Sequence, residues 1–265
     1  MKELTSTFGQ QMESAPEPIS FALRLLGGFD LSLNGRPVRI PDGSQSVIAF
    51  LALQTAPVRR SFVAGSLWSG RGDERAAANL RSALWRLRPD GSGLVVAIGT
   101  ALSLADTVSV DHLDTLRIAA RVIRGDPEIE TQLAWEVLSH VADFLPGWYD
   151  DWVVTERERL SQTRLRALEV LGRRALDHGQ IEQAIGLAQA VVLAEPLRET
   201  GHLLLAKAHL ANGNRADALR QIRRLDSLLR AELGIAASPE AWRIADLART
   251  AFDHPSVLVP LDNTG

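Results

Sequence analysis

The front of the chain begins with short stretches in which apolar and polar residues alternate. Residues 29–33 show this alternation, and residues 38–40 show it again after the Asn34-Gly35 pair. Asn-Gly accepts the positive φ angles of a two-residue hairpin turn, so the pattern predicts two antiparallel strands joined at this pair. A further strand is expected over residues 21–26. Together they predict a small N-terminal sheet.

Helical segments follow, and a second hairpin comes after them. Three helices are expected, over 47–54 with Ser44 as N-cap, over 62–68 with Ser61 as N-cap, and over 74–88 with Asp73 as N-cap. The apolar run 94–98, the Gly99-Thr100 pair and the alternation at 102–104 predict the closing hairpin. A small sheet, three helices and a hairpin, in this order, are typical of a winged helix-turn-helix. The sequence therefore predicts an N-terminal α+β winged helix.

The third predicted helix has two different faces. At 100° per residue, an apolar stripe forms from Leu80, Leu84 and Leu87. Four hydrogen-bond donors lie on roughly the opposite side: Arg75, Asn79, Ser82 and Arg86. Arg81 and Arg88 flank this face on one side and Trp85 on the other. Such a face suits the major groove, because arginine pairs bidentately with guanine and asparagine with adenine. An ordinary solvated helix face is the alternative.

Two adjacent arginines stand where the second helix is expected to begin. In a helix-turn-helix this end approaches the DNA backbone, so Arg59 and Arg60 are candidate phosphate contacts. A solvent-exposed pair with no ligand is the alternative.

The back of the chain reads as a series of helices that contains an internal repeat. Gly179 and Gly213 are 34 residues apart, and the same offset pairs Leu171 with Leu205, Gly172 with Ala206 and Ala184 with Ala218. A 34-residue period with small residues at the helix crossing is typical of tetratricopeptide repeats. A degenerate helix pair is expected over 114–141 and a capping helix over 239–253. The predicted back domain is all-α and tetratricopeptide-like.

The sequence contains none of the common enzyme motifs considered below. The chain has neither a phosphate-binding GxxxxGK[ST] loop nor a GxGxxG fingerprint, and its six histidines form no HExxH pattern. His202 and His209 are expected to pack in the repeats rather than bind metal. The aromatic segment 144–152 is expected to wedge the first helix pair against the repeats, and Asp150 and Asp151 are not expected to hold a metal. We expect no catalytic residue, metal or cofactor.

Composition and charge narrow the class of protein. The 265 residues include no cysteine, which excludes disulfides and thiolate chemistry. The net charge is −3, but residues 20–98 carry 10 arginines against 5 acids, whereas residues 99–265 carry 18 basic and 24 acidic groups. A basic front and an acidic back favour nucleic acid as the partner of the front. No apolar run is long enough for a membrane span, and residues 1–19 lack a signal-peptide core, so a cytoplasmic protein with a mobile first segment is expected.

These features resemble one family of bacterial regulators, the SARP (Streptomyces antibiotic regulatory protein) or AfsR-type regulators. Their OmpR-like winged helix is followed by a bacterial transcriptional activation domain. The resemblance is carried, in order, by residues 23–29, 34–38, 67–68, 78–88, 144–152, 156–160, 194–199 and 232–239. It implies domains at 20–106 and 111–256, with tails at 1–19 and 257–265.

The resemblance also implies a function. Family members activate transcription, often of antibiotic clusters, by binding promoter direct repeats as two protomers and recruiting RNA polymerase with its sigma factor. It implies that Arg75, Asn79, Arg81, Ser82 and Arg86 read bases and phosphates. The wing hairpin departs from the pattern because it has no arginine or lysine, which leaves Thr100 as its phosphate contact. A protein-interaction adaptor and a ligand-gated regulator, with Trp135, Trp148 and Trp152 as pocket residues, stay open as alternatives.

Overall fold

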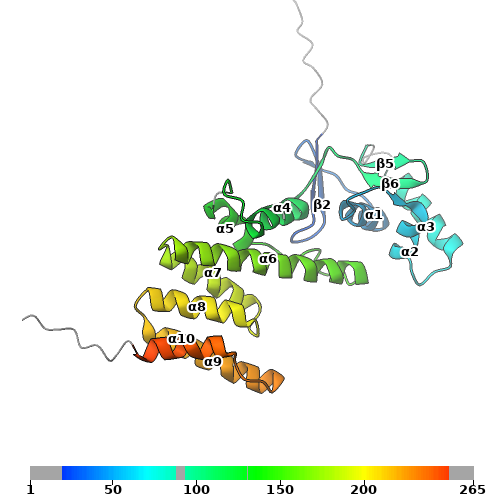
Figure 1. Ribbon diagram of the computed structural model, residues 1–265. Coiled ribbons are helices and arrows are strands. Elements are labelled where there is room, and N and C mark those ends of the chain that lie inside the picture. The colour runs from blue at the N-terminus through cyan, green and yellow to red at the C-terminus, as the bar shows by residue number, and fades with distance from the viewer. Residues whose placement is uncertain (1–19, 88–92, 130, 251–265) are drawn as a thin grey trace, which may run out of the picture. The chain divides into compact units, whose positions relative to one another are not determined.

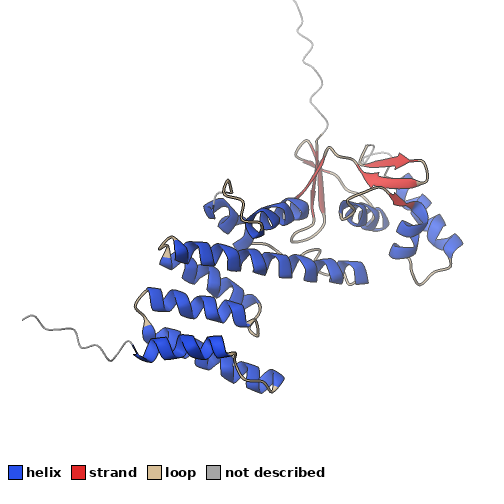
Figure 2. Ribbon diagram, viewed as in Figure 1, coloured by secondary structure: helices blue, strands red, loops and turns tan. Residues whose placement is uncertain are grey.

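The computed structural model describes residues 20–87, 93–129 and 131–250, and the chain divides into two compact units between Asp111 and His112. The first unit contains both sheets and three helices, and the described part of the second unit is helical (Figures 1 and 2). A winged helix followed by a helical-repeat domain is the fold class that the sequence predicts. The predicted tails, 1–19 and 257–265, and Arg88 lie outside the described residues.

The first unit opens with a four-stranded sheet. Its strands are β1 (Phe21–Arg24), β2 (Asp30–Leu33), β3 (Arg36–Pro37) and β7 (Val108–Val110), in the order β3-β2-β1-β7. The predicted hairpin is present: Asn34 (φ 48°) and Gly35 (φ 77°) form the turn between β2 and β3. Two consecutive positive φ angles match the right-handed twist of the strands, which is why Asn-Gly occupies this turn.

Three helices and a second sheet complete the first unit. The helices are α1 (Asp42–Ala52), α2 (Arg60–Leu67) and α3 (Asp73–Arg86), and the sheet has the order β4 (Val58–Arg59), β6 (Ala101–Leu104), β5 (Val95–Ile98). The β5–β6 hairpin is the predicted wing. Strand β4 pairs with β6 and was not predicted from the sequence.

The predicted N-caps of α1, α2 and α3 are wrong. Helix α3 begins after Gly72, so Asp73 is its first residue rather than its cap. Helix α1 begins after Pro41, so Ser44 lies within its first turn, where it is buried and donates a hydrogen bond to the Ala83 carbonyl (2.9 Å). Helix α2 begins after Arg59, because the β4–β6 pairing ends there. A long-range packing contact and a strand pairing thus replace the local capping chemistry of serine.

The second unit is a stack of helices. They are α4 (Asp111–Ile123), α5 (Thr131–Ser139), α6 (Asp151–Asp177), α7 (Ile181–Ala194), α8 (Glu199–Ala211), α9 (Arg215–Leu233) and α10 (Pro239–Thr250). Each neighbouring pair from α6 to α10 packs together. The predicted helix pair at 114–141 corresponds to α4 and α5, and the predicted capping helix to α10.

The 34-residue offset corresponds to two helical hairpins, α6–α7 and α8–α9. Gly179 (φ 70°) and Gly213 (φ 73°) occupy the equivalent turns, where a left-handed conformation favours glycine. At the crossing, a Cβ on Gly172 would lie 2.6 Å from Leu204 Cδ2 and 3.5 Å from Leu187 Cβ. The small residue predicted at this crossing is therefore required by the close approach of α6, α7 and α8.

Three arginines of α6 hold the segments that precede it. The Arg157 guanidinium donates to the carbonyls of Phe144 (3.0 Å), Leu145 (2.9 Å) and Trp148 (3.2 Å). Arg164 donates to the last carbonyls of α5, at Leu138 and Ser139, and Arg174 donates to the α4 carbonyl of Val122. Phe144 and Leu145, whose carbonyls accept these hydrogen bonds from Arg157, are fully buried and anchor the 144–152 segment.

Candidate nucleic-acid interface

Helix α3 is positioned by its packing against α1 and α2. Asp73 and Glu74 lie in its first turn and Arg86 in its last, which complements the helix dipole at both ends. The buried hydrogen bond from Ser44 Oγ to the Ala83 carbonyl fixes α3 against α1. The rotation of α3 about its own axis, and so the set of side chains it presents to solvent, is determined by these contacts.

The buried side of α3 differs from the predicted leucine stripe. Ala76, Leu80, Ala83 and Leu87 are buried, whereas Leu84 is only half-buried. The two alanines allow α3 to come close to its neighbouring helices. The buried face is therefore centred between the two alanines and the buried Leu80 and Leu87. The buried face of α3 is therefore rotated about the helix axis, relative to the face predicted from the three leucines alone.

This rotation changes which residues lie at the centre of the outer face. Trp85 is 69% exposed and lies opposite the alanine side, with Arg81 next to it. Arg75, Ser82 and Arg86 are exposed along one flank of this face. Asn79, predicted to share that flank, is half-buried because it faces the alanine side more closely. The prediction that Trp85 and Arg81 lie on opposite sides of the donor face is therefore wrong, since the two are neighbours on one side of it. Treating the alanines as core residues places Trp85 at the centre of the exposed face.

Strand β4 brings a second set of predicted residues together. Arg59 is paired with Ala101 in the β4–β6 ladder, and the Arg60 amide donates to the Thr100 carbonyl (3.0 Å). Arg59 and Thr100 are exposed and Arg60 is half-buried. The residues predicted to contact phosphate at the start of α2 (Arg59 and Arg60) and at the turn of the wing (Thr100) are therefore neighbours where β4 pairs with β6.

The charged side chains of this region are free to meet an external anion. Among the described residues, no ion pair involves Arg59, Arg60, Arg75, Arg81 or Arg86. In the second unit, at least one arginine on each of α4, α6, α9 and α10 is paired with a nearby carboxylate of its own helix. Unpaired guanidinium groups on an exposed face are what phosphate binding requires.

The wing carries no such charge. Val96 and Ile98 on β5 are 41% and 54% exposed, and Gly99 forms the turn with φ 58°. Polar contact at this tip can come from backbone amides and the Thr100 hydroxyl.

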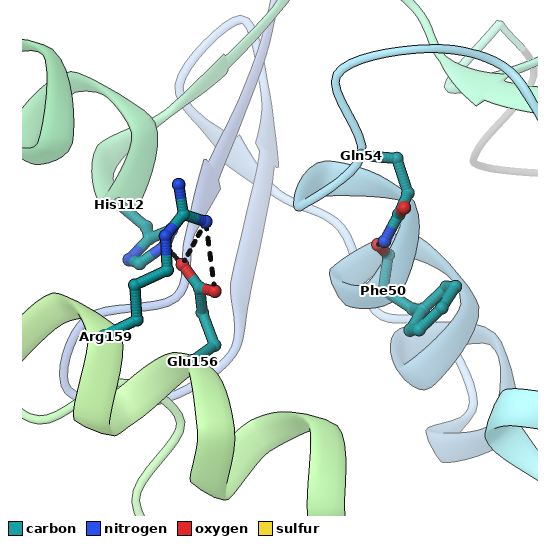
Figure 3. A network of polar contacts seen from close by, with 5 residues as sticks. All are labelled: Phe50, Gln54, His112, Glu156 and Arg159. Atoms are coloured by element: carbon teal, nitrogen blue, oxygen red, sulfur yellow. Dashed lines mark hydrogen bonds and ion pairs between the residues drawn. The ribbon is translucent and has the colours of Figure 1, made fainter.

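The second unit contains a buried polar network that connects α4 to α6 (Figure 3). His112 Nε2 lies 2.7 Å from Glu156 Oε1, and Arg159 donates to both oxygens of the same carboxylate at 3.3 Å. Burial favours a raised pKa for Glu156, but the hydrogen bond and charge of His112 and the charge of Arg159 outweigh it and hold the pKa below its usual value. The network joins α4 to α6 through side chains that are buried or largely buried. Figure 3 also shows Gln54, which follows the end of α1 and donates to the Phe50 carbonyl of that helix.

Neither a metal cluster nor a membrane helix is found in the described parts of the chain. Across residues 20–87, 93–129 and 131–250, no three histidine or carboxylate side chains are placed to share a metal ion. Within the same ranges, no helix combines the length and apolar character needed to cross a bilayer. Asp150 and Asp151 are exposed at the start of α6.

The class of protein follows from comparison with known families. The sequence model of the family described as "Bacterial transcriptional activator domain" matches residues 105–246, which is more than half of the chain. The chain belongs to this family, and the resemblance to SARP/AfsR-type regulators is confirmed. The family is a class of transcriptional regulators rather than a class of enzymes.

A solved structure extends the likeness to both units. Mycobacterium tuberculosis EmbR in complex with a low-affinity phosphopeptide is similar, with a TM-score of 0.64 and 20% sequence identity. The match covers 87% of this chain and 65% of that one, so the chain spans about two thirds of the length of EmbR. At this identity the likeness is one of fold, and the phosphopeptide is a ligand of EmbR. No curated protein sequence matches the chain.

Proposed function

We propose that the chain is a sequence-specific DNA-binding activator whose first unit binds promoter DNA. The observation that carries this proposal is the set of unpaired arginines on α3 and at the β4–α2 junction. The outer face of α3 enters the major groove, where Arg75, Arg81, Ser82 and Arg86 meet bases and phosphates. Arg59, Arg60 and Thr100 hold the adjacent phosphates.

Asn79 has a narrower role in this proposal. Because its side chain is half-buried, it reaches DNA only where α3 lies deep in the groove. Its amide is suited to adenine, so it contributes to sequence preference rather than to overall affinity.

The resemblance to SARP regulators supplies the biological context. We place the protein in the cytoplasm, as two protomers on promoter direct repeats, where the second unit recruits RNA polymerase with its sigma factor. The target genes are those of an antibiotic or other secondary-metabolite cluster. Transcript levels in a strain that lacks the protein test this context: unchanged levels of any such cluster would contradict it.

Selection of bound sequences from a random duplex library tests the DNA-binding proposal. The expected result is an enriched motif that occurs twice in the same orientation, with an affinity that falls steeply with salt. A folded protein that enriches no motif would overturn the proposal and favour the protein-interaction adaptor.

A further inference from the structure

The second unit contains a groove that crosses α7, α8 and α9 and differs in character from one end to the other. Its first part is a hollow of about 440 Å³ whose apolar walls include Val192, Leu193 and Leu205. Its second part, of about 430 Å³, is lined by Arg220, Arg223 and Arg224 and by one carboxylate, that of Asp217. His209, Gln221 and Arg224 line both hollows, so the two parts are continuous.

The apolar end includes a leucine that is largely exposed. Leu193 is 85% exposed on the last turn of α7, although leucine is among the residues most often buried in proteins. It lies beside Val192 and opposite Leu205 of α8, so a side chain from a partner would find apolar atoms on more than one side. This end suits an aliphatic or aromatic anchor residue.

The cationic end is available for an external anion. Among the described residues, Arg223 and Arg224 form no ion pair, whereas Arg220 is paired with Asp217 of its own helix. The buried Nδ1 atom of His209 has no hydrogen-bond partner within the same described ranges. The two free, exposed guanidinium groups therefore supply the positive charge of a groove in the acidic half of the chain, and the His209 Nδ1 atom lies buried behind its surface.

The internal repeat shows that this groove differs in its lining from the first hairpin, where Trp135 and the start of α7 line a hollow of about 650 Å³. In the first hairpin, Trp135 of α5 packs so closely on Gly186 that a Cβ there would lie 2.8 Å from the indole Cη2. The residue 34 positions after Gly186 is Arg220, and α9 carries a cationic rim where α7 accepts an aromatic ring. The second copy of the repeat has therefore exchanged an internal aromatic contact for an exposed, charged opening.

We infer that the α7–α8–α9 groove binds an acidic peptide segment of a partner protein, with an apolar anchor against Leu193 and carboxylates against Arg223 and Arg224. The charge of the rim requires a negative partner, and the apolar end favours a peptide over the evenly charged backbone of a nucleic acid. A groove of aliphatic residues and free arginines is suited to such segments. Peptide binding in this groove does not require DNA, so it can be tested independently of the proposed DNA-binding function.

Selection from a random peptide library displayed on phage, with the full chain as target, tests this inference. The expected winners combine aspartate or glutamate with a large apolar residue. A fluorescein-labelled copy of the winner then gives dissociation constants by anisotropy. Arg223→Glu/Arg224→Glu is expected to raise Kd about tenfold or more, since two attractive charges become repulsive. Leu193→Ser is expected to weaken binding several-fold while leaving the thermal stability unchanged.

Two controls keep the result specific. Arg173→Glu reverses an exposed charge on α6 outside the groove, and Leu247→Ser removes an exposed leucine from α10, 62% exposed. Neither is expected to change Kd. Winners without acidic residues, no winner from a folded target, or equal losses in groove and control variants would overturn the inference. Loss of duplex DNA binding without loss of peptide binding on Arg223→Glu/Arg224→Glu would assign the groove to nucleic acid instead.

Discussion

The salt dependence of DNA binding gives a direct count of the arginines that meet phosphate. Five unpaired arginines are presented by α3 and the β4–α2 junction: Arg59, Arg60, Arg75, Arg81 and Arg86. If each neutralises one phosphate, the slope of log affinity against log salt is about −4.5 per protomer. Between about 50 and 200 mM salt, the affinity for a duplex with one copy of the motif then falls about 500-fold.

Arg59→Ala/Arg60→Ala is the perturbation that tests this count. Arg59 ends strand β4 and Arg60 begins α2 beside Thr100, and neither belongs to the base-reading face of α3. Their loss is therefore expected to make the slope shallower by about 1.8 and to weaken the binding of selected and random duplexes alike. Fluorescence anisotropy over a salt series on both duplexes measures the slope. Because Arg59 and Arg60 pair with no carboxylate among the described residues, the variant is expected to fold normally.

A matched double variant separates specific contact from net charge. Arg117→Ala/Arg249→Ala removes two exposed arginines of the second unit, each already paired with an aspartate, at Asp114 and Asp246. Its slope is expected to equal that of the wild type. If both double variants change the slope equally, or if Arg59→Ala/Arg60→Ala leaves it unchanged, the assignment of these residues to phosphate is wrong.

Three further substitutions test the site and its scaffold. Asn79→Ala is expected to reduce the preference for the selected motif by about 1–3 kcal/mol with little loss on random DNA; equal losses on both would contradict its role. Arg157→Ala is expected to lower the free energy of unfolding by about 2–4 kcal/mol in urea titrations, because three part-buried carbonyls lose a charged donor; a change within the error of the wild type would refute this. Glu156→Gln tests the pH dependence of stability. The lowered pKa of Glu156 means that its contribution is present above the unfolded value of about 4.3 and is lost as pH falls through the folded pKa. Urea titrations are expected to show that the free energy of unfolding falls less on acidification in Glu156→Gln than in the wild type. The same pH dependence in both proteins would contradict the role of the network.

Local patterns predicted those parts of the fold that depend on neighbouring residues. The Asn34-Gly35 turn requires two positive φ angles, and both are present. The spacing of Gly179 and Gly213 reflects one repeated helical hairpin, and each turn adopts the expected conformation. In these cases the chemistry that determines the structure lies within a few residues of the motif, or at a fixed repeat from it.

Contacts between distant residues explain what the sequence did not reveal. Strand β4 is two residues long and forms only because β6, more than 40 positions later, supplies its partner. Ser44 leaves the capping position to bond the Ala83 carbonyl of α3. The network of His112 with Glu156 joins residues separated by 44 positions and carries no local signature.

The outer face of α3 illustrates the same limit for the candidate site. Leucine positions alone indicated the core side of the helix, but Ala76 and Ala83 are buried as well. Small side chains add little to a hydrophobic pattern, yet they decide how closely a helix approaches its neighbours and hence its rotation. Trp85 lies at the centre of the exposed face for this reason.

The arginines of α6 have a consequence for how the second unit comes apart. Arrays of helical hairpins commonly fray from their ends, because each repeat contacts only its neighbours. Here Arg157, Arg164 and Arg174 attach the carbonyls of α4, α5 and the 144–148 segment to a single 27-residue helix that also packs on α7 and α8. Amide hydrogens of α4 and α5 should therefore exchange with solvent together with those of α6, in one cooperative opening, while α10 at the far end exchanges earlier and on its own.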